Sequence, residues 1–296
     1  MTYSLSRRRM LSATMALGGA AALATYAAPP VLAQPATELE TLERANDVAI
    51  GVYAVNLDTG RTVSHRAQES FAMCSTFKAY LAAHVLALVA RGERSLDQGL
   101  YVAAADILPN SPRTEPRVGT EMTLGELSQA VLQVSDNAAA NILLRDVGGP
   151  QAITAFARGI GDPRSRLDRF ETELNSAVPG DPRDTTTPEA IGGGVRTLLT
   201  GDVLPPEQRG LLEEWMRANE TSSMRPGLPA GWTTADKTGS GDYGTTNDVG
   251  IAYGPQGERL LLSILTRSAS DNADAENNRP LIGEVATVVF AELTRG

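Results

Sequence analysis

The chain has 296 residues, of which 42% are hydrophobic and 21% charged, a composition typical of a folded protein rather than a disordered or fibrous one. Its formal net charge of −9 argues against a nucleic-acid-binding surface. A single cysteine excludes an internal disulfide and a cysteine-cluster metal site, and the two histidines, His65 and His84, have no metal-ligand spacing. We therefore expect no metal, no cofactor and no nucleic-acid partner.

Residues 1–33 have the pattern of an export signal. The basic residues Arg7, Arg8 and Arg9 precede an apolar, alanine-rich run, and Ala33 offers a small residue at a cleavage point. The arginines resemble a twin-arginine signal, which exports a folded protein. A mitochondrial-type presequence is the alternative, whereas the run is too short for a lasting membrane anchor. We expect a periplasmic or secreted protein with no membrane contact after processing.

The predicted elements of the remaining chain form three blocks. A short acidic helix at 37–44 is followed by a strand at 48–55, and the Asp-Thr-Gly turn at 58–60 reverses the chain into a strand at 61–65. Apolar residues at three- and four-residue spacing then predict helices at 77–89, 124–134, 138–146, 188–199 and 208–216. Strands return at 233–237, 249–253 and 260–266, before a last helix at about 280–293.

This order of elements predicts an α+β fold. An antiparallel five-stranded sheet, built from both ends of the chain and flanked by helices, would carry an inserted all-helical domain. Residues 34–70 and 218–296 would form the α/β domain, and residues 71–217 the all-α domain. We expect a cleft where the two meet. The polar stretch 161–184 shows no periodicity, which is typical of a functional or a disordered loop.

Lysine is rare in this chain, and both of its occurrences are informative. Lys78 and Lys237 stand against 24 arginines, and lysine, unlike arginine, can give up its proton in a protein. Lys78 lies three residues after Ser75, so at the start of a helix the two side chains share one face. The helix N-terminus there favours a developing negative charge. The pair could be a nucleophile with its base, although one such spacing also arises by chance.

Two further motifs follow along the chain. Ser135-Asp136-Asn137 separates two predicted helices, where Asp136 or Asn137 could equally be a helix N-cap. Lys237-Thr238-Gly239-Ser240-Gly241 ends a strand and opens a glycine-rich turn. An edge strand of this kind offers backbone groups to a peptide-like ligand and a cation to a carboxylate, but it could also be a plain strand-to-turn junction.

Together these three motifs, in this order, are the signature of class A β-lactamases and penicillin-binding proteins. The chain after residue 33 resembles the class A serine β-lactamases along essentially its whole length, and residues 169–184 match that family's omega loop. The resemblance implies hydrolysis of the β-lactam ring of penicillins and cephalosporins through a serine acyl-enzyme, which confers antibiotic resistance. It also implies a monomer that binds a small-molecule β-lactam substrate.

The resemblance assigns the catalytic roles. Ser75 would be the nucleophile, and its N–H together with that of Ser240 would form the oxyanion hole. Lys78 and Glu171 are alternative bases for acylation, a choice that the family leaves disputed. Glu171 would also activate the water that hydrolyses the acyl-enzyme. Ser135 would relay a proton to the leaving nitrogen.

The resemblance also assigns substrate-binding residues. Asn137 would bind the side-chain amide of the substrate, and Lys237 and Thr238 its carboxylate. The remaining expected binding residues are Asn175, which would also hold the water with Glu171, and the strand residues Gly239 and Ser240. Arg169 and Asp184 would close the omega loop by an ion pair.

Several positions depart from the family pattern. Thr172 follows Glu171 where many relatives have a proline after a cis bond, which leaves the arrangement of the loop open. Asn110 stands where an aromatic residue often walls the cleft, which predicts a more open or more polar entrance. Cys74 has no second cysteine with which to form the disulfide of some carbapenem-hydrolysing relatives.

Substrate preference is predicted from two further features. The arginine that many relatives place near the substrate carboxylate is absent from its usual sites, here Ser223, Thr246 and Asn278, so that Arg279 or Arg225 would have to substitute. Ser240-Gly241-Asp242 resembles enzymes with broad cephalosporin activity. We expect hydrolysis of penicillins and cephalosporins, with weak or no carbapenem turnover.

Three other functions compete with this interpretation. A penicillin-binding D-Ala-D-Ala peptidase shares the motifs, but Glu171 and the omega loop argue against it. A non-catalytic β-lactam sensor usually belongs to a larger membrane protein, and this sequence offers no lasting membrane segment or signalling domain. A serine esterase of the α/β-hydrolase kind lacks support because no Gly-x-Ser-x-Gly motif occurs.

Overall fold

The computed structural model describes residues 35–295, so the expected export signal lies outside the described residues. Within them, no helix has the length and apolar character needed to cross a bilayer. The chain begins with α1 (Pro35–Asn46) and enters a five-stranded antiparallel sheet in the order β2-β1-β9-β8-β7. Its strands are β1 (Val48–Asn56), β2 (Thr62–His65), β7 (Thr233–Ser240), β8 (Thr246–Tyr253) and β9 (Arg259–Ser268).

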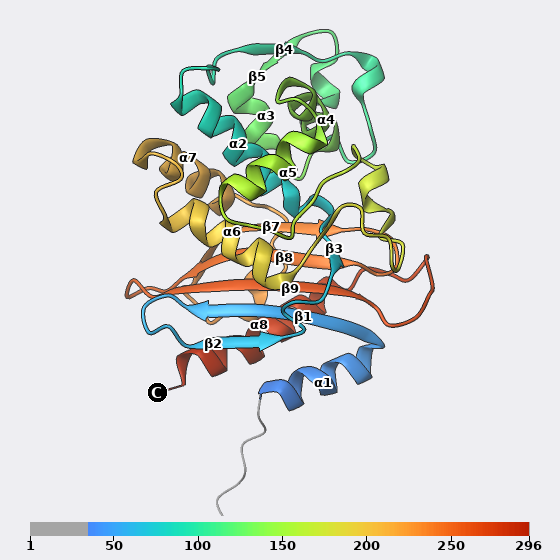
Figure 1. The fold of residues 1–296 in the computed structure, drawn as a ribbon, viewed down its shortest axis with the longest axis vertical. Helices are drawn as coiled ribbons and strands as arrows, with labels where there is room; N and C mark the ends of the chain where they lie inside the picture. Colours follow the sequence, from blue (N-terminus) through green and yellow to red (C-terminus); the bar gives the residue numbers. More distant parts are fainter. Residues whose placement is uncertain (1–34, 296) are drawn as a thin grey trace, which may run out of the picture. The chain divides into compact units, whose positions relative to one another are not determined.

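Strands from the two ends of the sequence lie side by side in this sheet. β1 pairs with β9 along its whole length, with Val52 opposite Ile264. β7 lies at one edge and β2 at the other (Figure 1). The prediction of an antiparallel five-stranded sheet built from both chain ends is confirmed.

Helices cover both faces of the sheet (Figure 1). α1 and α8 (Arg279–Thr294) pack on one face, where alternate strand residues such as Val52, Leu262 and Ile264 are fully buried. α6 (Pro188–Thr200) packs on the other face, where Leu261 and Leu265 join the core of the helical block. The period-two alternation along β9 therefore supplies two apolar cores, one on each side of the sheet.

The inserted block is mainly helical, as predicted. α2 (Lys78–Ala90) is buried along most of its length and packs against α3, α4, α5 and α7. These neighbours are α3 (Leu124–Gln133), α4 (Asn137–Asp146), α5 (Pro150–Gly159) and α7 (Pro206–Arg217). The helix α5 is absent from the sequence prediction, although its buried Ile153 and Ala157 have the four-residue spacing of a helix face.

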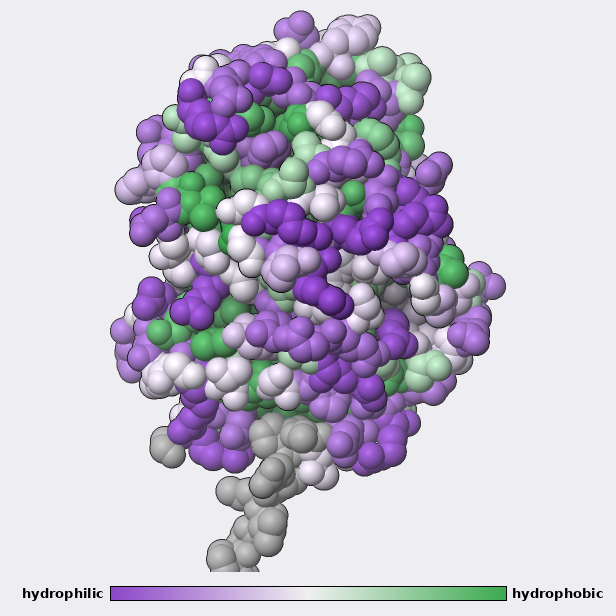
Figure 2. Space-filling view, viewed as in Figure 1, coloured by the Kyte–Doolittle hydropathy of each residue, from purple (hydrophilic) through white to green (hydrophobic). Residues whose placement is uncertain are grey.

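Short elements complete the described chain. Two-stranded sheets pair β3 (Phe71–Ala72) with β6 (Thr185–Thr186) and β4 (Gly99–Tyr101) with β5 (Glu121–Thr123). The 3-10 helices are η1 (Cys74–Phe77), η2 (Ala104–Asp106), η3 (Glu115–Arg117), η4 (Glu173–Ser176) and η5 (Arg225–Gly227). The sequence predicts none of these short elements. Hydrophilic residues cover most of the face shown in Figure 2, and hydrophobic ones form small separate patches.

The segment 169–184 is closed by contacts at its two ends. Arg169 Nε donates to Asp184 Oδ2 at 2.6 Å, and the buried Asp184 carboxylate also accepts from the N–H groups of Asp168 and Arg169. The N–H of Met73 donates to the carbonyl of Asp184 at 2.9 Å. The loop is therefore fixed directly to the residues that precede Ser75. The division into domains at residues 70 and 217 stays a prediction.

Candidate active site

Ser75 and Lys78 meet at the start of α2. η1, which contains Ser75, runs directly into α2, whose first residue is Lys78. Lys78 Nζ donates to Ser75 Oγ at 3.0 Å, and the lysine side chain is fully buried. The two side chains share one face, as the three-residue spacing predicts.

Ser135 and Asn137 face the same lysine from the turn between α3 and α4. Lys78 Nζ lies 2.9 Å from the carbonyl oxygen of Ser135, 3.3 Å from its Oγ and 2.7 Å from Asn137 Oδ1. Asp136 points the other way and caps α4, because its carboxylate accepts from the N–H of Ala139 at 2.9 Å. The motif therefore has two residues beside Lys78 and one N-cap, and the N-cap interpretation is correct for Asp136.

Lys237 approaches Ser135 from the edge strand β7. Its Nζ donates to Ser135 Oγ at 3.1 Å and to the carbonyl of Thr238 at 2.8 Å. Burial, and secondly the charge of Lys78, lower the pKa of Lys237 to about 7. The hydroxyl of Ser135 thus lies between the only two lysines of the chain.

Glu171 enters the site from the omega loop. Its Oε1 lies 3.2 Å from Ser75 Oγ and 2.9 Å from Lys78 Nζ, and its Oε2 accepts from Asn175 Nδ2 at 2.5 Å. The residue is only 5% exposed. The peptide bond between Glu171 and Thr172 is cis, although residue 172 is not a proline.

Asn141 holds the main chain of Glu171 and was missed by the sequence analysis. Its Oδ1 accepts from the N–H of Glu171 at 2.9 Å, and its Nδ2 donates to the carbonyl of the same residue at 2.8 Å. Asn141 lies on α4 four residues after Asn137, so the two asparagines share a helix face. That spacing was the one available signal in the sequence.

A cavity of about 240 Å³ opens above these groups. Its lining includes Ser75, Asn110, Ser135, Asn137, Asn175, Thr238, Gly239, Ser240 and Arg279. Gly239 allows β7 to pass close to the nucleophile, because a Cβ there would lie 3.2 Å from the backbone nitrogen of Ser75. Of the nine lining residues named here, seven were predicted as site residues.

The two candidate arginines differ in position. Arg279 lines the cavity, at the start of α8. Arg225 instead donates from Nε to Thr234 Oγ1 at 2.9 Å and lies 3.5 Å from Asp236 Oδ1. Asn110 also lines the cavity and is exposed, in agreement with a polar entrance.

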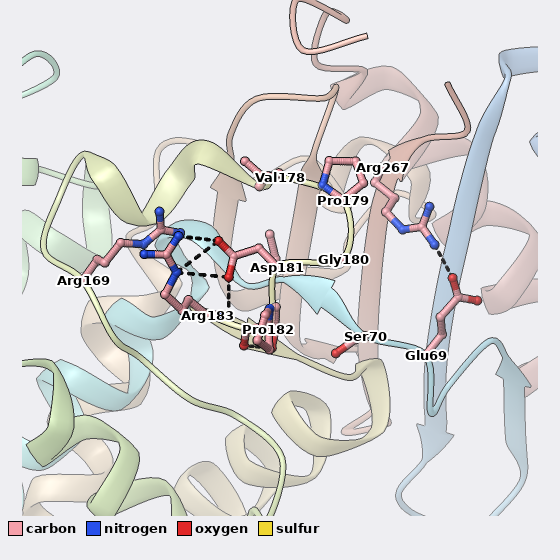
Figure 3. A pocket seen from close by; sticks show the side chains of 13 residues that line it. Glu69, Ser70, Arg169, Val178, Pro179, Gly180, Asp181, Pro182, Arg183 and Arg267 are labelled. Carbon is pink, nitrogen blue, oxygen red and sulfur yellow. Dashed lines mark hydrogen bonds and ion pairs between the residues drawn. The ribbon is translucent and has the colours of Figure 1, made fainter. Parts of the chain in front are cut away.

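A second cavity, of about 410 Å³, lies between residues 177–183 of the omega loop and residues 69–72 (Figure 3). Three of its lining residues are arginines. Each is paired with a carboxylate: Arg169 with Asp184, Arg183 with Asp181 and Arg267 with Glu69. The cavity therefore offers no unpaired arginine to an anion among the described side chains.

Comparison with known proteins agrees with this geometry. The model of a family described as the beta-lactamase enzyme family matches residues 34–293. The chain belongs to this family. A beta-lactamase of Streptomyces cellulosae is 43% identical, over 97% of this chain and 96% of the relative. Beta-lactamase CTX-M-8 of Citrobacter amalonaticus is also 43% identical, over 85% of this chain and 87% of the relative.

Solved structures of class A beta-lactamases resemble most of this chain. The class A beta-lactamase of the last common ancestor of Gram-negative bacteria is 46% identical to this chain, with a TM-score of 0.84. The match covers 88% of this chain and 99% of that one. The beta-lactamase from Desulfarculus baarsii is 43% identical, with a TM-score of 0.85, and the match covers 88% of this chain and 98% of that one. The predicted fold class and the predicted class A family are confirmed.

Proposed function

We propose that this β-lactamase hydrolyses penicillins and cephalosporins through an acyl-enzyme on Ser75 and thereby confers resistance to them. The observation that carries the proposal is the buried carboxylate of Glu171, whose Oε1 lies 3.2 Å from Ser75 Oγ. A carboxylate in that position can activate a water against an ester on the serine. A base for deacylation distinguishes a hydrolase, which releases its product repeatedly, from a protein that remains acylated.

In acylation, Ser75 Oγ attacks the lactam carbonyl carbon and the carbon–nitrogen bond breaks. The serine proton goes to Glu171, or to Lys78 after Lys78 has passed its own proton to Glu171; both groups lie within hydrogen-bond reach of Oγ. The N–H groups of Ser75 and Ser240 would stabilise the developing oxyanion. Ser135 Oγ would protonate the leaving nitrogen and recover a proton from one of the two lysines, which lie 3.3 and 3.1 Å away.

In deacylation, a water between Glu171 and Asn175 would give its proton to Glu171 and attack the ester carbonyl. Asn175 Oδ1 supports this role, because it is buried and has no hydrogen-bond donor among the described residues. Asn175 Nδ2 holds the carboxylate at 2.5 Å, which leaves Oδ1 to accept a bond from the water. The proton then returns to Ser75 Oγ as the product acid leaves.

Substrate binding would use the walls of the 240 Å³ cavity. Lys237, Thr238 and Arg279 would bind the substrate carboxylate, and Asn137 the side-chain amide. The backbone of Gly239 and Ser240 would align the substrate along β7. Following the Ser240-Gly241-Asp242 pattern, we propose cephalosporin as well as penicillin turnover and little carbapenem turnover.

We also propose that the protein acts as a monomer outside the cytoplasm. The basic and apolar segment 1–33 supports export, with cleavage near Ala33 and a periplasmic or secreted product. The fusion of residues 1–33 to a folded reporter, with the paired Arg8→Lys and Arg9→Lys substitutions as control, tests the twin-arginine route.

Turnover of a chromogenic cephalosporin tests the hydrolase function. The wild type should turn over many times, whereas Glu171→Gln should release one equivalent of product and stop, with the acyl group detectable by mass spectrometry. Glu173→Gln is the matched control, because Glu173 is an exposed acid on the same loop. A wild type that stops after one equivalent would instead favour a penicillin-binding peptidase or a sensor.

A further inference from the structure

Asn110 contacts the Ser135–Asn137 turn at two points. Its side-chain Nδ2 donates to the carbonyl of Ser135 at 2.9 Å, and its own carbonyl accepts from the N–H of Asn137 at 2.9 Å. Asn110 lies between η2 and η3, in the segment before α3, and lines the cavity. Asn110 therefore contacts the backbone of both Ser135 and Asn137, the two residues of this turn that face Lys78.

The carbonyl that Asn110 binds is also a ligand of Lys78. Lys78 Nζ donates to the same Ser135 oxygen at 2.9 Å, so this oxygen accepts from both side chains. Two donors are the full capacity of a carbonyl oxygen. Together with Asn137 Oδ1 and Glu171 Oε1, this oxygen places Lys78 Nζ relative to the Ser75 and Ser135 hydroxyls.

Backbone conformation makes this contact important. Ser135 has a φ of 58°, in the left-handed region that residues other than glycine occupy only when surrounding contacts hold them there. Asn110 has the same φ of 58°, and asparagine tolerates this region better than bulky or β-branched residues do. Asn110 is thus suited to its own conformation while its amide holds the less favourable one of Ser135.

We propose that Asn110 is a positioning residue for acylation. It holds the Ser135 hydroxyl and Lys78 Nζ in the positions from which they transfer protons. This inference rests on the proposed function. Deacylation should depend on Asn110 less, because Asn141 holds the main chain of Glu171 and Asn175 holds its Oε2, whereas Lys78 contacts only Oε1. A loss confined to acylation is therefore the signature of the role.

Three substitutions test the contact. Asn110→Asp keeps the size but replaces the donor with an acceptor, and Asn110→Gly keeps the backbone conformation but removes the amide. Asn110→His restores a donor, because its Nδ1 is as many bonds from Cα as the asparagine Nδ2, and histidine also tolerates a positive φ. Asp47→Gly is the matched control, since Asp47 is exposed, has a φ of 51° and lies before β1, outside the cavity lining.

Stopped-flow measurement with a chromogenic cephalosporin gives the acylation and deacylation rates separately. One hydrogen bond predicts acylation about three- to tenfold slower in Asn110→Asp and Asn110→Gly, with deacylation within about twofold of wild type and partial recovery in Asn110→His. Wild-type acylation in both variants would overturn the inference, as would equal slowing of both steps with a lowered Tm. If the wild type acylates but never turns over, the proposed function fails while the acylation rates still test Asn110.

Discussion

Lys78 Nζ and Glu171 Oε1 lie 2.9 Å apart, and both side chains are completely buried. Ser75 Oγ lies within 3.2 Å of each, so the nucleophile, the amine and the carboxylate form one contact group. Removing one member of a buried ion pair leaves the other charge without compensation, which costs more than removing both. The catalytic arrangement is therefore also a determinant of stability.

A double-mutant cycle tests this coupling. Lys78→Met should destabilise the protein by about 3–5 kcal/mol, because it leaves the Glu171 carboxylate buried and unpaired. Adding Glu171→Gln to Lys78→Met should recover part of that loss. Urea unfolding of wild type, both single variants and the double variant gives the coupling energy. Additive effects would show that the two groups do not act as a pair.

Asn141 should matter mainly through the omega loop. Asn141→Leu removes both hydrogen bonds to the main chain of Glu171 and leaves two buried backbone groups unpaired, which costs about 2–4 kcal/mol. We expect a lower Tm and an acyl-enzyme that persists, since the carboxylate loses its fixed position. Asn141→Asp keeps the acceptor for the N–H of Glu171 and should have a smaller effect on both. Equal deacylation in Asn141→Leu and wild type would contradict this role.

Lys237 should give the activity an alkaline limit. Burial and the charge of Lys78 lower its pKa to about 7, so the free enzyme loses this cation as the pH rises through 7. A neutral amine attracts the substrate carboxylate less, and kcat/KM should fall above that pH, mainly through KM. Lys237→Arg keeps its charge at every accessible pH, so its kcat/KM should not fall above pH 7, although its activity should be lower overall. An unchanged alkaline limb in the arginine variant would exclude Lys237 as its source.

Local and pattern-based features of the site could be predicted from the sequence. The Ser75–Lys78 spacing places both side chains on one helix face. The predicted strands lie near the two ends of the sequence, so they can form one sheet only by pairing with each other. Residues whose role depends on tertiary contacts could not be predicted in this way. Asn141 is an ordinary polar residue within α4 until Glu171 comes against it from a loop 30 residues later.

The omega loop shows the same limit in part. The family resemblance implied the ion pair between Arg169 and Asp184, but no periodic pattern in the sequence encodes the bonds from the backbone of residues 168 and 169 to the Asp184 carboxylate. The two arginines considered for the substrate carboxylate also differ only in three dimensions. Arg279 lines the cavity, whereas Arg225 contacts Thr234 and Asp236.

Gly241 should be intolerant of a side chain. A Cβ at this position would lie 2.4 Å from the carbonyl oxygen of Asn175 and 2.8 Å from Cys74 Sγ. Gly241→Ala should therefore displace the loop from β7 and break the 2.9 Å bond from the N–H of Asp242 to Asn175. We expect slower deacylation and a lower Tm, measured by stopped flow and thermal unfolding. Gly159→Ala, at the exposed end of α5, is the matched control, because Gly159 also lacks a positive φ and no atom lies within 4 Å of its added Cβ.

Asp248 should make stability depend on pH. Burial, and secondly the neighbouring carboxylate of Asp236, raise the pKa of Asp248 well above 3.8. Its Oδ2 accepts from the N–H groups of Ser223 and Met224, whereas its buried Oδ1 has no donor in the described part of the chain. The folded state thus favours the protonated acid, and stability should fall as the pH rises from about 4 through the raised pKa.

Asp248→Asn should remove the loss of stability that wild type shows as the pH rises. The amide oxygen can keep the bonds to Ser223 and Met224, while the amide nitrogen can donate to Asp236 without a titrating proton. The Tm of the variant relative to wild type should therefore increase between pH 5.5 and 8.5. Asp271→Asn, at an exposed carboxylate, should show no such trend. A constant Tm difference for Asp248→Asn across this range would mean that Asp248 is already ionised in the folded protein, with its charge compensated by the two N–H donors.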